Sequence, residues 1–387
     1  MIERKEYKTL ISKALARSPI TAILGPRQCG KTTIARSFAE ENASTYFDLE
    51  DSETLARLEK PRLALEGLRG LIIIDEIQRL PSLFPTLRVL ADRPNGIRSR
   101  FLLLGSASPD LIKHSSETLA GRIEFIEMSP FSMAEVGESA WHDLWIRGGM
   151  PRSFLSANEE DSVAWRENFI RTFLERDIPA LGLRLPPLQL RRFWTMIAHY
   201  HGQVWNASEI GRSLALSDHA VKRYLDLLTE TYLVRQLTPW FANIKKRQVK
   251  SPKIYIRDTG LLHTLLRLRT EEEVTHHPKC GASWEGFAVE QILQSTRARE
   301  SHYWATHTGA EIDLLVDFGN RQYAFECKYT DAPRTTRSMH TALETLAPEH
   351  LYVVYPGKNS FPLDEQITAV GIEVLPKILR DRLKYEG

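Results

Sequence analysis

The stretch GPRQCGKTT, from Gly25 to Thr33, decides the fold of the first part of this chain. It matches the pattern of a phosphate-binding loop, in which two glycines enclose four residues and are followed by lysine and a hydroxyl residue. The apolar run ITAIL precedes the loop, and TIARSFAEE, a good helix former, follows it. We therefore expect the loop N–H groups and the helix N-terminus to converge on nucleotide phosphates. The alternative is a glycine-rich turn that binds nothing.

The residue types in this loop suit separate tasks. Gly25 and Gly30 let the backbone approach phosphate oxygens closely. Lys31 can reach the β- and γ-phosphates, and Thr32 offers a hydroxyl ligand to Mg²⁺. The sequence thus predicts ATP and Mg²⁺ as cofactors. The nucleotide contacts are expected along the whole loop, at Gly25, Pro26, Arg27, Gln28, Cys29, Gly30, Lys31, Thr32 and Thr33.

Short apolar runs alternate with helical stretches on both sides of the loop: ITAIL, TYFDLE, LIIID, RFLLLG and RIEFIE. This alternation predicts a parallel sheet with helices on both faces. The third run ends in Asp75 and Glu76. We expect Asp75 to hold Mg²⁺ and Glu76 to act as the catalytic residue that deprotonates or orients the attacking water. A strand whose terminal acids simply meet solvent is the alternative.

Two further residues of this region are candidates for phosphate sensing. Ser106 follows the apolar run RFLLLG, where its hydroxyl could lie near the γ-phosphate, although small turn residues end strands in the same way. Arg122 opens the next strand and could supply positive charge to the transition state, either within the chain or across a subunit boundary of a homo-oligomer. A solvated arginine at a strand start is the alternative.

Composition points to a cytoplasmic protein. The 387 residues carry 51 basic and 49 acidic side chains, so any nucleic-acid-binding surface must be local. The three cysteines show neither a disulfide framework nor metal-ligand spacing. The charged start lacks the apolar core of a signal peptide, and LIIID is too short to span a bilayer, so we expect no membrane partner.

The middle of the chain predicts a helix-turn-helix that continues into a winged helix. Helical spacing runs from Ala164 to His201, and NASEIGRSLALSDHAVKRYLDLLTETYLVRQL then indicates helix, turn, helix and strand. Basic residues on the second helix and on the following hairpin can neutralise DNA phosphates. The alternative is a solvated face on a segment that only bridges two domains. The residues concerned are Lys222 and Arg223 on the helix, and Lys245, Lys246, Arg247, Lys250 and Lys253 around the hairpin.

The last third contains a second acidic site. EIDLLV and QYAFECKY predict a hairpin that brings Asp313 near Glu326 and Lys328, the last two on one face. Two carboxylates and a lysine can bind Mg²⁺ and stabilise an attacking water. This arrangement resembles the restriction-endonuclease-like core, and Glu285 on the preceding helix would match that fold's additional acid and metal ligand. Cross-strand salt bridges are the alternative.

The chain resembles the bacterial and archaeal ATPases of the AAA superfamily that carry a C-terminal domain of unknown function. The segments that carry this resemblance are GPRQCGKTT, LIIIDEIQ, LLLGSAS, LAGRIEF and GGMP. The resemblance covers essentially the whole chain, because RDTGLL and the final acidic motif also fit. It implies an AAA-type P-loop domain over residues 1–147, a helical connector with a winged helix over 148–270, and a restriction-endonuclease-like domain over 271–387.

Two functions of different classes follow. In the first, ATP turnover drives a DNA-binding motor or remodeller whose C-terminal domain grips or cuts DNA. In the second, the protein is a nucleotide-driven switch that recognises a protein or RNA partner without nuclease activity. A metabolic kinase is disfavoured, because nothing after the P-loop region resembles a small acceptor pocket.

Overall fold

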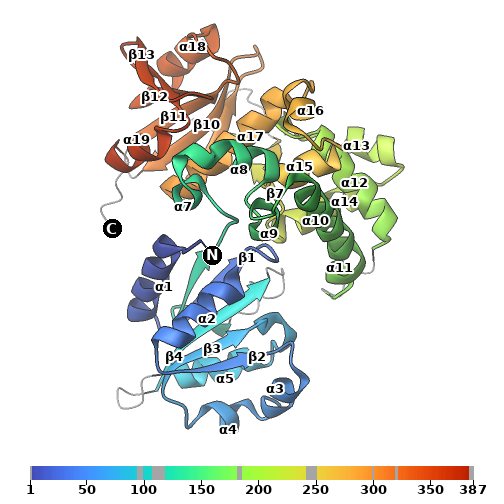
Figure 1. Ribbon diagram of the computed structural model, residues 1–387, viewed down its shortest axis with the longest axis vertical. Helices are drawn as coiled ribbons and strands as arrows, with labels where there is room; N and C mark the ends of the chain where they lie inside the picture. Colours follow the sequence, from blue (N-terminus) through green and yellow to red (C-terminus); the bar gives the residue numbers. More distant parts are fainter. Residues whose placement is uncertain are drawn as a thin grey trace. The chain divides into compact units, whose positions relative to one another are not determined.

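The computed structural model describes residues 2–93, 99–106, 118–180, 185–240, 251–298, 300–318 and 321–382. Contacts within the chain divide it into two compact units, Met1–Pro130 with Glu230–Tyr232, and Phe131–Thr229 with Leu233–Gly387. Figure 1 labels their helices and strands. No helix of the described residues is long and apolar enough to cross a membrane.

The first unit is built on a five-stranded sheet, all of whose strands run parallel, in the order β2-β3-β4-β1-β5. This confirms the predicted parallel sheet. The strands are β1 (Ile20–Gly25), β2 (Ser44–Asp48), β3 (Gly70–Asp75), β4 (Ser99–Ser106) and β5 (Ile123–Glu127). The helices are α1 (Lys5–Arg17), α2 (Lys31–Glu41), α3 (Ser52–Arg57), α4 (Pro61–Leu65), the 3₁₀ turn η1 (Ile77–Arg79) and α5 (Leu83–Ala91).

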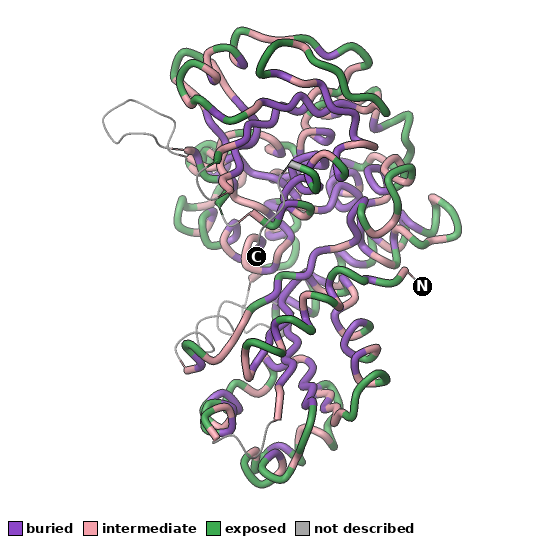
Figure 2. The backbone as a smooth tube through the Cα atoms, turned by 90° about the vertical axis from the view of Figure 1, so that its left-hand side faces the viewer, coloured by how far each residue is buried: buried purple, intermediate pink, exposed green. Residues whose placement is uncertain are grey.

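Both faces of this sheet are buried, which explains why its strands are almost continuously apolar. On one face Ile72 and Ile74 of β3 pack in a cluster with Leu87 of α5. On the other face Ile73 packs with Ile34 of α2. The central strands are accordingly buried along the tube in Figure 2.

The strand order determines where the site lies. β4 is inserted between β1 and β3, so the loop that leaves β1 and the acids that end β3 emerge from the same edge of the sheet on either side of β4. This is the topological switch point at which open α/β sheets bind ligands.

The second unit begins with a helical region that includes a small antiparallel sheet in the order β6-β8-β7. Its strands are β6 (Gln203–Val204), β7 (Val234–Leu237) and β8 (Lys253–Ile256). Its helices are α7 (Met133–Val136), η2 (Glu138–Ala140), α8 (Trp141–Arg147), α9 (Pro151–Phe154), α10 (Glu159–Thr172), the π-helical η3 (Phe173–Asp177), α11 (Ile178–Ala180), α12 (Pro187–His199), α13 (Ala207–Leu214), α14 (Asp218–Glu230), α15 (Thr259–Leu265) and α16 (Glu271–Thr275).

The predicted helix-turn-helix is formed by α13 and α14. The Asn206 side chain accepts a hydrogen bond from the Glu209 N–H at 3.2 Å and begins α13, and the Ser217 hydroxyl accepts from Ala220 N at 3.2 Å and begins α14. Ile210 and Val221 are fully buried between the helices. The predicted caps and apolar face of this motif are therefore present.

The C-terminal part of the second unit is a six-stranded sheet in the order β13-β14-β12-β11-β10-β9. Strands β9, β10 and β11 are antiparallel, whereas β11, β12 and β14 run parallel. The strands are β9 (Glu300–Ala305), β10 (Glu311–Phe318), β11 (Arg321–Cys327), β12 (His350–Tyr355), β13 (Ser360–Asp364) and β14 (Ile367–Gly371), and the helices are α17 (Cys280–Thr296), α18 (Arg337–Leu346) and α19 (Leu375–Arg382). The predicted hairpin corresponds to β10 and β11.

Candidate functional sites

The loop after β1 has the backbone of a phosphate cradle. Gln28 and Gly30 have positive φ angles of 62° and 103°, and Gly30 leads into α2 without a side-chain cap on its N–H groups. A Cβ on Gly25 would lie 2.1 Å from the Met128 carbonyl oxygen, so only glycine fits there. The Lys31 ammonium is buried and donates to the carbonyls of Gly25 and Pro26 at 3.1 and 2.8 Å.

Asp75 joins the loop to the end of β3. Its Oδ2 accepts hydrogen bonds from the Thr32 hydroxyl at 2.8 Å and from the Tyr46 hydroxyl at 2.6 Å, and its Oδ1 accepts from Glu76 N at 2.9 Å. The Asp75 carboxylate is only 3% exposed. The two residues predicted to hold Mg²⁺, Thr32 and Asp75, are thus in direct contact although 43 residues separate them.

Glu76 occupies an uncommon backbone conformation beside this pair. Its φ of 55° and ψ of 43° are left-handed, which costs a non-glycine residue energy and is often found at functional sites. Burial raises the pKa of its carboxyl; the nearby Lys31 charge opposes that shift, and Asp75 adds to it. The Gln78 amide donates to one of its oxygens. The arrangement gives a half-shielded carboxylate with a proton affinity above that of an ordinary glutamate.

The donors of this site fit a magnesium–nucleotide complex. Thr32 and Asp75 offer a hydroxyl and a carboxylate, which are hard oxygen ligands. The Gly30 cradle and the N-terminus of the 11-residue α2 offer N–H groups to phosphate. The side chains predicted at the remaining loop positions are less directly placed: Arg27 lies 3.8 Å from Glu50, and Cys29 is buried against the Met128 carbonyl, while Gln28 and Thr33 are exposed.

Two other predicted residues, Arg122 and Ser106, have different outcomes. Arg122 lies before β5, next to the start of β1, where the Ile20 N–H bonds its carbonyl at 3.1 Å. Its guanidinium pairs with Asp92 at 2.5 and 2.9 Å. That is the edge of the sheet opposite the loop, so the structure does not support contact of Arg122 with the nucleotide of its own chain. The Ser106 backbone ends β4 opposite Gly25, and its side chain lies outside the described part of the chain.

Sequence reasoning missed three residues that support the site. Tyr46 holds Asp75, Gln78 holds Glu76, and Arg4 donates to the Cys29 carbonyl of the loop at 2.9 Å and to Ser129 O at 2.9 Å. Tyr46 lies on β2, beside β3, so the strand order would have identified it. The Arg4 contact spans 25 residues and leaves no pattern in the sequence.

The acids of the C-terminal sheet form a second cluster. Asp313 and Glu326 lie across the β10–β11 hairpin, one residue beyond the paired Leu314 and Phe325. Asp313 Oδ2 accepts from Cys327 N at 2.9 Å, and the Lys328 ammonium pairs with Glu326 Oε1 at 2.6 Å. Burial and the nearby Asp313 raise the pKa of Glu326 to about 8. The predicted proximity of Asp313, Glu326 and Lys328 is therefore present.

A lysine from another sheet occupies this acidic cluster. The Lys253 ammonium lies 3.0 Å from Glu285 Oε1 and 3.3 Å from Asp313 Oδ1, and it also pairs with Glu311. Lys253 was expected on the surface of a DNA-binding hairpin, and that expectation is wrong, because its side chain is only 3% exposed. Burial and Asp313 raise the pKa of Glu285 to about 7, against the opposing charge of Lys253.

The predicted C-terminal ligands do not converge as a metal centre would require. Among the described residues, the group whose ligand atoms all lie within 4.8 Å of one another is Glu300, His302 and Asp317, whereas Asp313, Glu326 and Glu285 do not form such a group. An ammonium already contacts two of the three predicted acids. The side chains present thus do not fit a divalent cation at this cluster.

The residues predicted to contact DNA divide into two groups. Lys222 and Arg223 are exposed on α14, on the face opposite the buried Val221 and Leu225. Lys245, Lys246 and Arg247 lie outside the described residues, as does Lys250. Of the predicted basic surface, the α14 cations are accessible, whereas Lys253 is buried.

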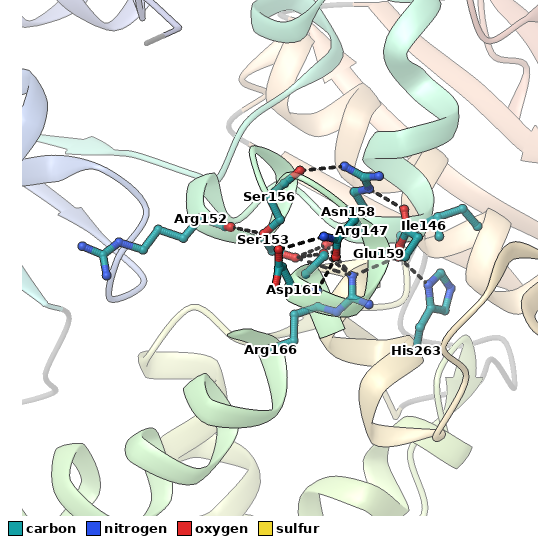
Figure 3. A network of polar contacts seen from close by, with 11 residues as sticks. Ile146, Arg147, Arg152, Ser153, Ser156, Asn158, Glu159, Asp161, Arg166 and His263 are labelled. Atoms are coloured by element: carbon teal, nitrogen blue, oxygen red, sulfur yellow. Dashed lines mark hydrogen bonds and ion pairs between the residues drawn. The ribbon is translucent and has the colours of Figure 1, made fainter. Parts of the chain in front are cut away.

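The GGMP and RDTGLL motifs meet in a buried polar network. Asp258 Oδ2 accepts from the N–H groups of Gly149 and Met150 at 2.8 and 3.2 Å, and a Cβ on Gly148 would lie 2.2 Å from Asp258 Oδ1. Figure 3 shows Arg166 reaching into this region, where it donates to the Arg147 carbonyl at 3.0 Å. These motif residues bind one another, so their role is to join the start of the second unit to α15.

Comparison with known proteins places these features in a family. An AAA domain matches residues 17–137, and two domains of unknown function match 138–272 and 280–375. Uncharacterized proteins of Mycobacterium tuberculosis and Mycobacterium bovis are each 50% identical over 370 residues, covering 96% of this chain and 84% of theirs. A Walker-type ATPase of Pyrococcus abyssi is 15% identical, with a TM-score of 0.48 over 69% of this chain and 96% of that one.

The family models divide the chain near the predicted limits of 147 and 270, whereas contacts divide it at 130, so the three-domain division stays a prediction. The loop from Gly25 to Thr33, the acids that end β3 and the parallel sheet all lie in the first compact unit. The chain belongs to the family of these mycobacterial proteins, which is a family of AAA-superfamily P-loop ATPases with C-terminal domains of unknown function.

Proposed function

We propose that this chain hydrolyses ATP at the loop and carboxylate pair of its first unit. Lys31 and the loop N–H groups would bind the β- and γ-phosphates of the substrate. Thr32 and Asp75 would hold Mg²⁺, which when bound supplies positive charge to the phosphate oxygens. The observation that carries the proposal is the 2.8 Å hydrogen bond between Thr32 and Asp75, because it joins the two halves of the site.

Glu76 is the proposed base or water-orienting residue. It follows Asp75 directly and is half-buried, so its carboxylate is shielded but still accessible. A carboxylate whose pKa is raised by burial accepts a proton more readily than an ordinary one, which suits a general base. The hydrogen bond from Gln78 would hold one oxygen and leave the other to the water.

Steady-state ATP hydrolysis by the purified chain tests this proposal, with Glu76→Gln as the matched variant. The amide keeps the shape of the side chain but cannot take a proton. Turnover by the wild-type chain and its loss in Glu76→Gln, with ATP binding retained, is the expected result. Turnover that survives the substitution would assign it to another residue or to a contaminating enzyme.

We further propose that the helix-turn-helix of α13 and α14 contacts DNA. Support comes from the exposed Lys222 and Arg223 on α14 and from the basic residues of the predicted hairpin, in a chain whose total charge is balanced. Lys222→Ala with Arg223→Ala should weaken DNA binding and reduce its salt dependence by about two counterions. The triple substitution of Lys245, Lys246 and Arg247 by alanine tests the hairpin, and unchanged affinity in both variants would exclude this surface.

The second candidate function is a nucleotide-driven switch without nuclease activity. The contact of Lys253 with Glu285 and Asp313 favours a C-terminal domain that binds rather than cuts. Hydrolysis assays with single-stranded, duplex and branched DNA distinguish the two candidates. Stimulation by one DNA form supports the motor, and turnover indifferent to every DNA supports the switch.

A further inference from the structure

The C-terminal acids are held by a cation that belongs to the chain itself. We propose that the Lys253 ammonium is the resident cation of the cluster formed by Glu285, Glu311 and Asp313, and that this cluster therefore binds no divalent metal ion. This inference goes beyond ATP hydrolysis and does not depend on it, because all the residues concerned lie in the second unit.

The position of Lys253 follows from the alternation of side chains along β8. Ile254 and Ile256 point to one face and are fully buried in the core of the helical region. Lys253 and Tyr255, two residues apart, therefore share the opposite face. Tyr255 donates to Glu285 Oε1 at 2.6 Å, and Lys253 contacts the same oxygen at 3.0 Å. The strand thus presents a cation and a hydroxyl together to one carboxylate of α17.

The base of the hairpin is fixed, which keeps the lysine in place. Lys253 lies opposite Val204 of β6 and Leu237 of β7, so it is on the central strand of its sheet. Trp240 and Ser251 are also bonded to β9. Trp240 N donates to the Tyr303 carbonyl at 2.7 Å, and the Tyr303 hydroxyl donates to the Ser251 carbonyl at 2.5 Å. The ammonium therefore reaches the acids from a strand anchored on both sides.

The contacts of Lys253 Nζ are those of an ammonium with carboxylates. Lys253 Nζ lies 3.0 and 3.3 Å from its carboxylate oxygens in Glu285 and Asp313, as in charged hydrogen bonds. Mg²⁺ would need its ligands at about 2.1 Å in octahedral geometry. Removing one partner of such a buried pair leaves an uncompensated charge and is strongly destabilising.

The carboxylate cluster becomes available to a metal ion only when the Lys253 ammonium is removed. Glu326 Oε2 is buried and has no hydrogen-bond partner among the described residues, while Oε1 pairs with Lys328. With Lys253 removed, the oxygens of Glu285, Glu311 and Asp313 that now contact its ammonium would be left uncompensated. Loss of the lysine should therefore create a cation site that the wild-type chain lacks.

Mn²⁺ binding to the full chain without nucleotide, followed by electron paramagnetic resonance of the free ion, tests the proposal. Lys253→Met keeps the length and apolar stem of the side chain but removes its charge. We expect Lys253→Met to bind an additional Mn²⁺ per chain compared with wild type, and Lys253→Met with Asp313→Asn to lose it. Lys328→Met is the matched control, which retains Lys253 and should gain no ion.

If circular dichroism shows that Lys253→Met does not fold, the proposal is tested in the wild-type background instead. Asp313→Asn in the wild-type background should leave the number of bound Mn²⁺ ions unchanged. A decrease would mean that a divalent cation already binds there, which would overturn the proposal. A folded Lys253→Met chain that binds no additional Mn²⁺ would overturn it as well. Any ion held at the P-loop is common to these variants and responds to Asp75→Asn instead.

Discussion

The acidic clusters of the two units contain similar residues, but their carboxylates have different partners. In the first unit, Asp75 accepts hydrogen bonds from the neutral hydroxyls of Thr32 and Tyr46, while the nearby Lys31 donates to loop carbonyls. In the second unit, Asp313 and Glu285 face the ammonium of Lys253. A carboxylate held by hydroxyls keeps its charge for an incoming cation. A carboxylate held by an ammonium does not, so similar motifs predict different chemistry.

The largest expected effect separates the two clusters by activity. Glu76→Gln should lower the rate of ATP hydrolysis by about 10²–10⁴-fold, the usual contribution of a positioned general base. Asp313→Asn, its counterpart in the second cluster, should leave that rate within experimental error of wild type. Steady-state phosphate release measures both. Equal losses would show that the C-terminal acids take part in ATP turnover and would break the comparison.

Removing the lysine of each cluster should affect stability very differently. Lys253→Ala leaves buried carboxylates uncompensated and should cost about 3–5 kcal/mol of unfolding free energy. Lys31→Ala removes an ammonium whose hydrogen bonds, among the described residues, go to backbone carbonyls, so its cost should be smaller, about 1–3 kcal/mol. Urea unfolding measures both, and the reverse order would contradict the assigned roles.

The tyrosines that hold the two clusters offer a finer comparison. Tyr46 donates to Asp75 and Tyr255 donates to Glu285, both at 2.6 Å. Because groups that orient metal ligands influence metal affinity, Tyr46→Phe should raise the Mg²⁺ concentration needed for half-maximal hydrolysis by roughly 10-fold. Tyr255→Phe should not change it. A magnesium titration of the hydrolysis rate tests the pair, and identical curves for both variants would refute the assignment.

The smallest expected effect concerns pH. The folded-state pKa values of Glu285 and Glu326 are raised to about 7 and about 8, by burial first and by Asp313 second. Their contribution to stability is therefore present at acid pH and is lost as the pH rises through those values. Asp313→Asn removes the second cause. Between about pH 5 and about pH 9 the wild-type chain should lose more stability than the variant, by on the order of 1 kcal/mol. An equal loss in both chains would show that Asp313 does not couple to these groups.

The fold and the first site were predictable because their signals are local. The loop from Gly25 to Thr33 is contiguous, and the strand rule places the acids after β3 at the same edge of the sheet. Arg122 illustrates the same rule at the opposite edge of the sheet. A residue that opens a parallel strand lies at the edge opposite the loop, which the alternation of strands alone could have indicated.

The second site depended on contacts that no local pattern encodes. Asp313 and Glu326 follow from hairpin register, but Lys253 lies 60 residues from Asp313 in sequence and comes from a different sheet. Its basic neighbours in the sequence suggested a solvent-facing hairpin. The alternation Lys253, Ile254, Tyr255, Ile256 does indicate two faces, yet it cannot tell that the polar one meets acids rather than water.

Mn²⁺ binding measured with and without a non-hydrolysable ATP analogue tests the central comparison most directly. We expect the analogue to add a tightly bound ion to the wild-type chain, Asp75→Asn to abolish this added ion, and Asp313→Asn to have no effect under either condition. An ion that binds without nucleotide and disappears in Asp313→Asn would show instead that the C-terminal acids form a metal centre despite Lys253.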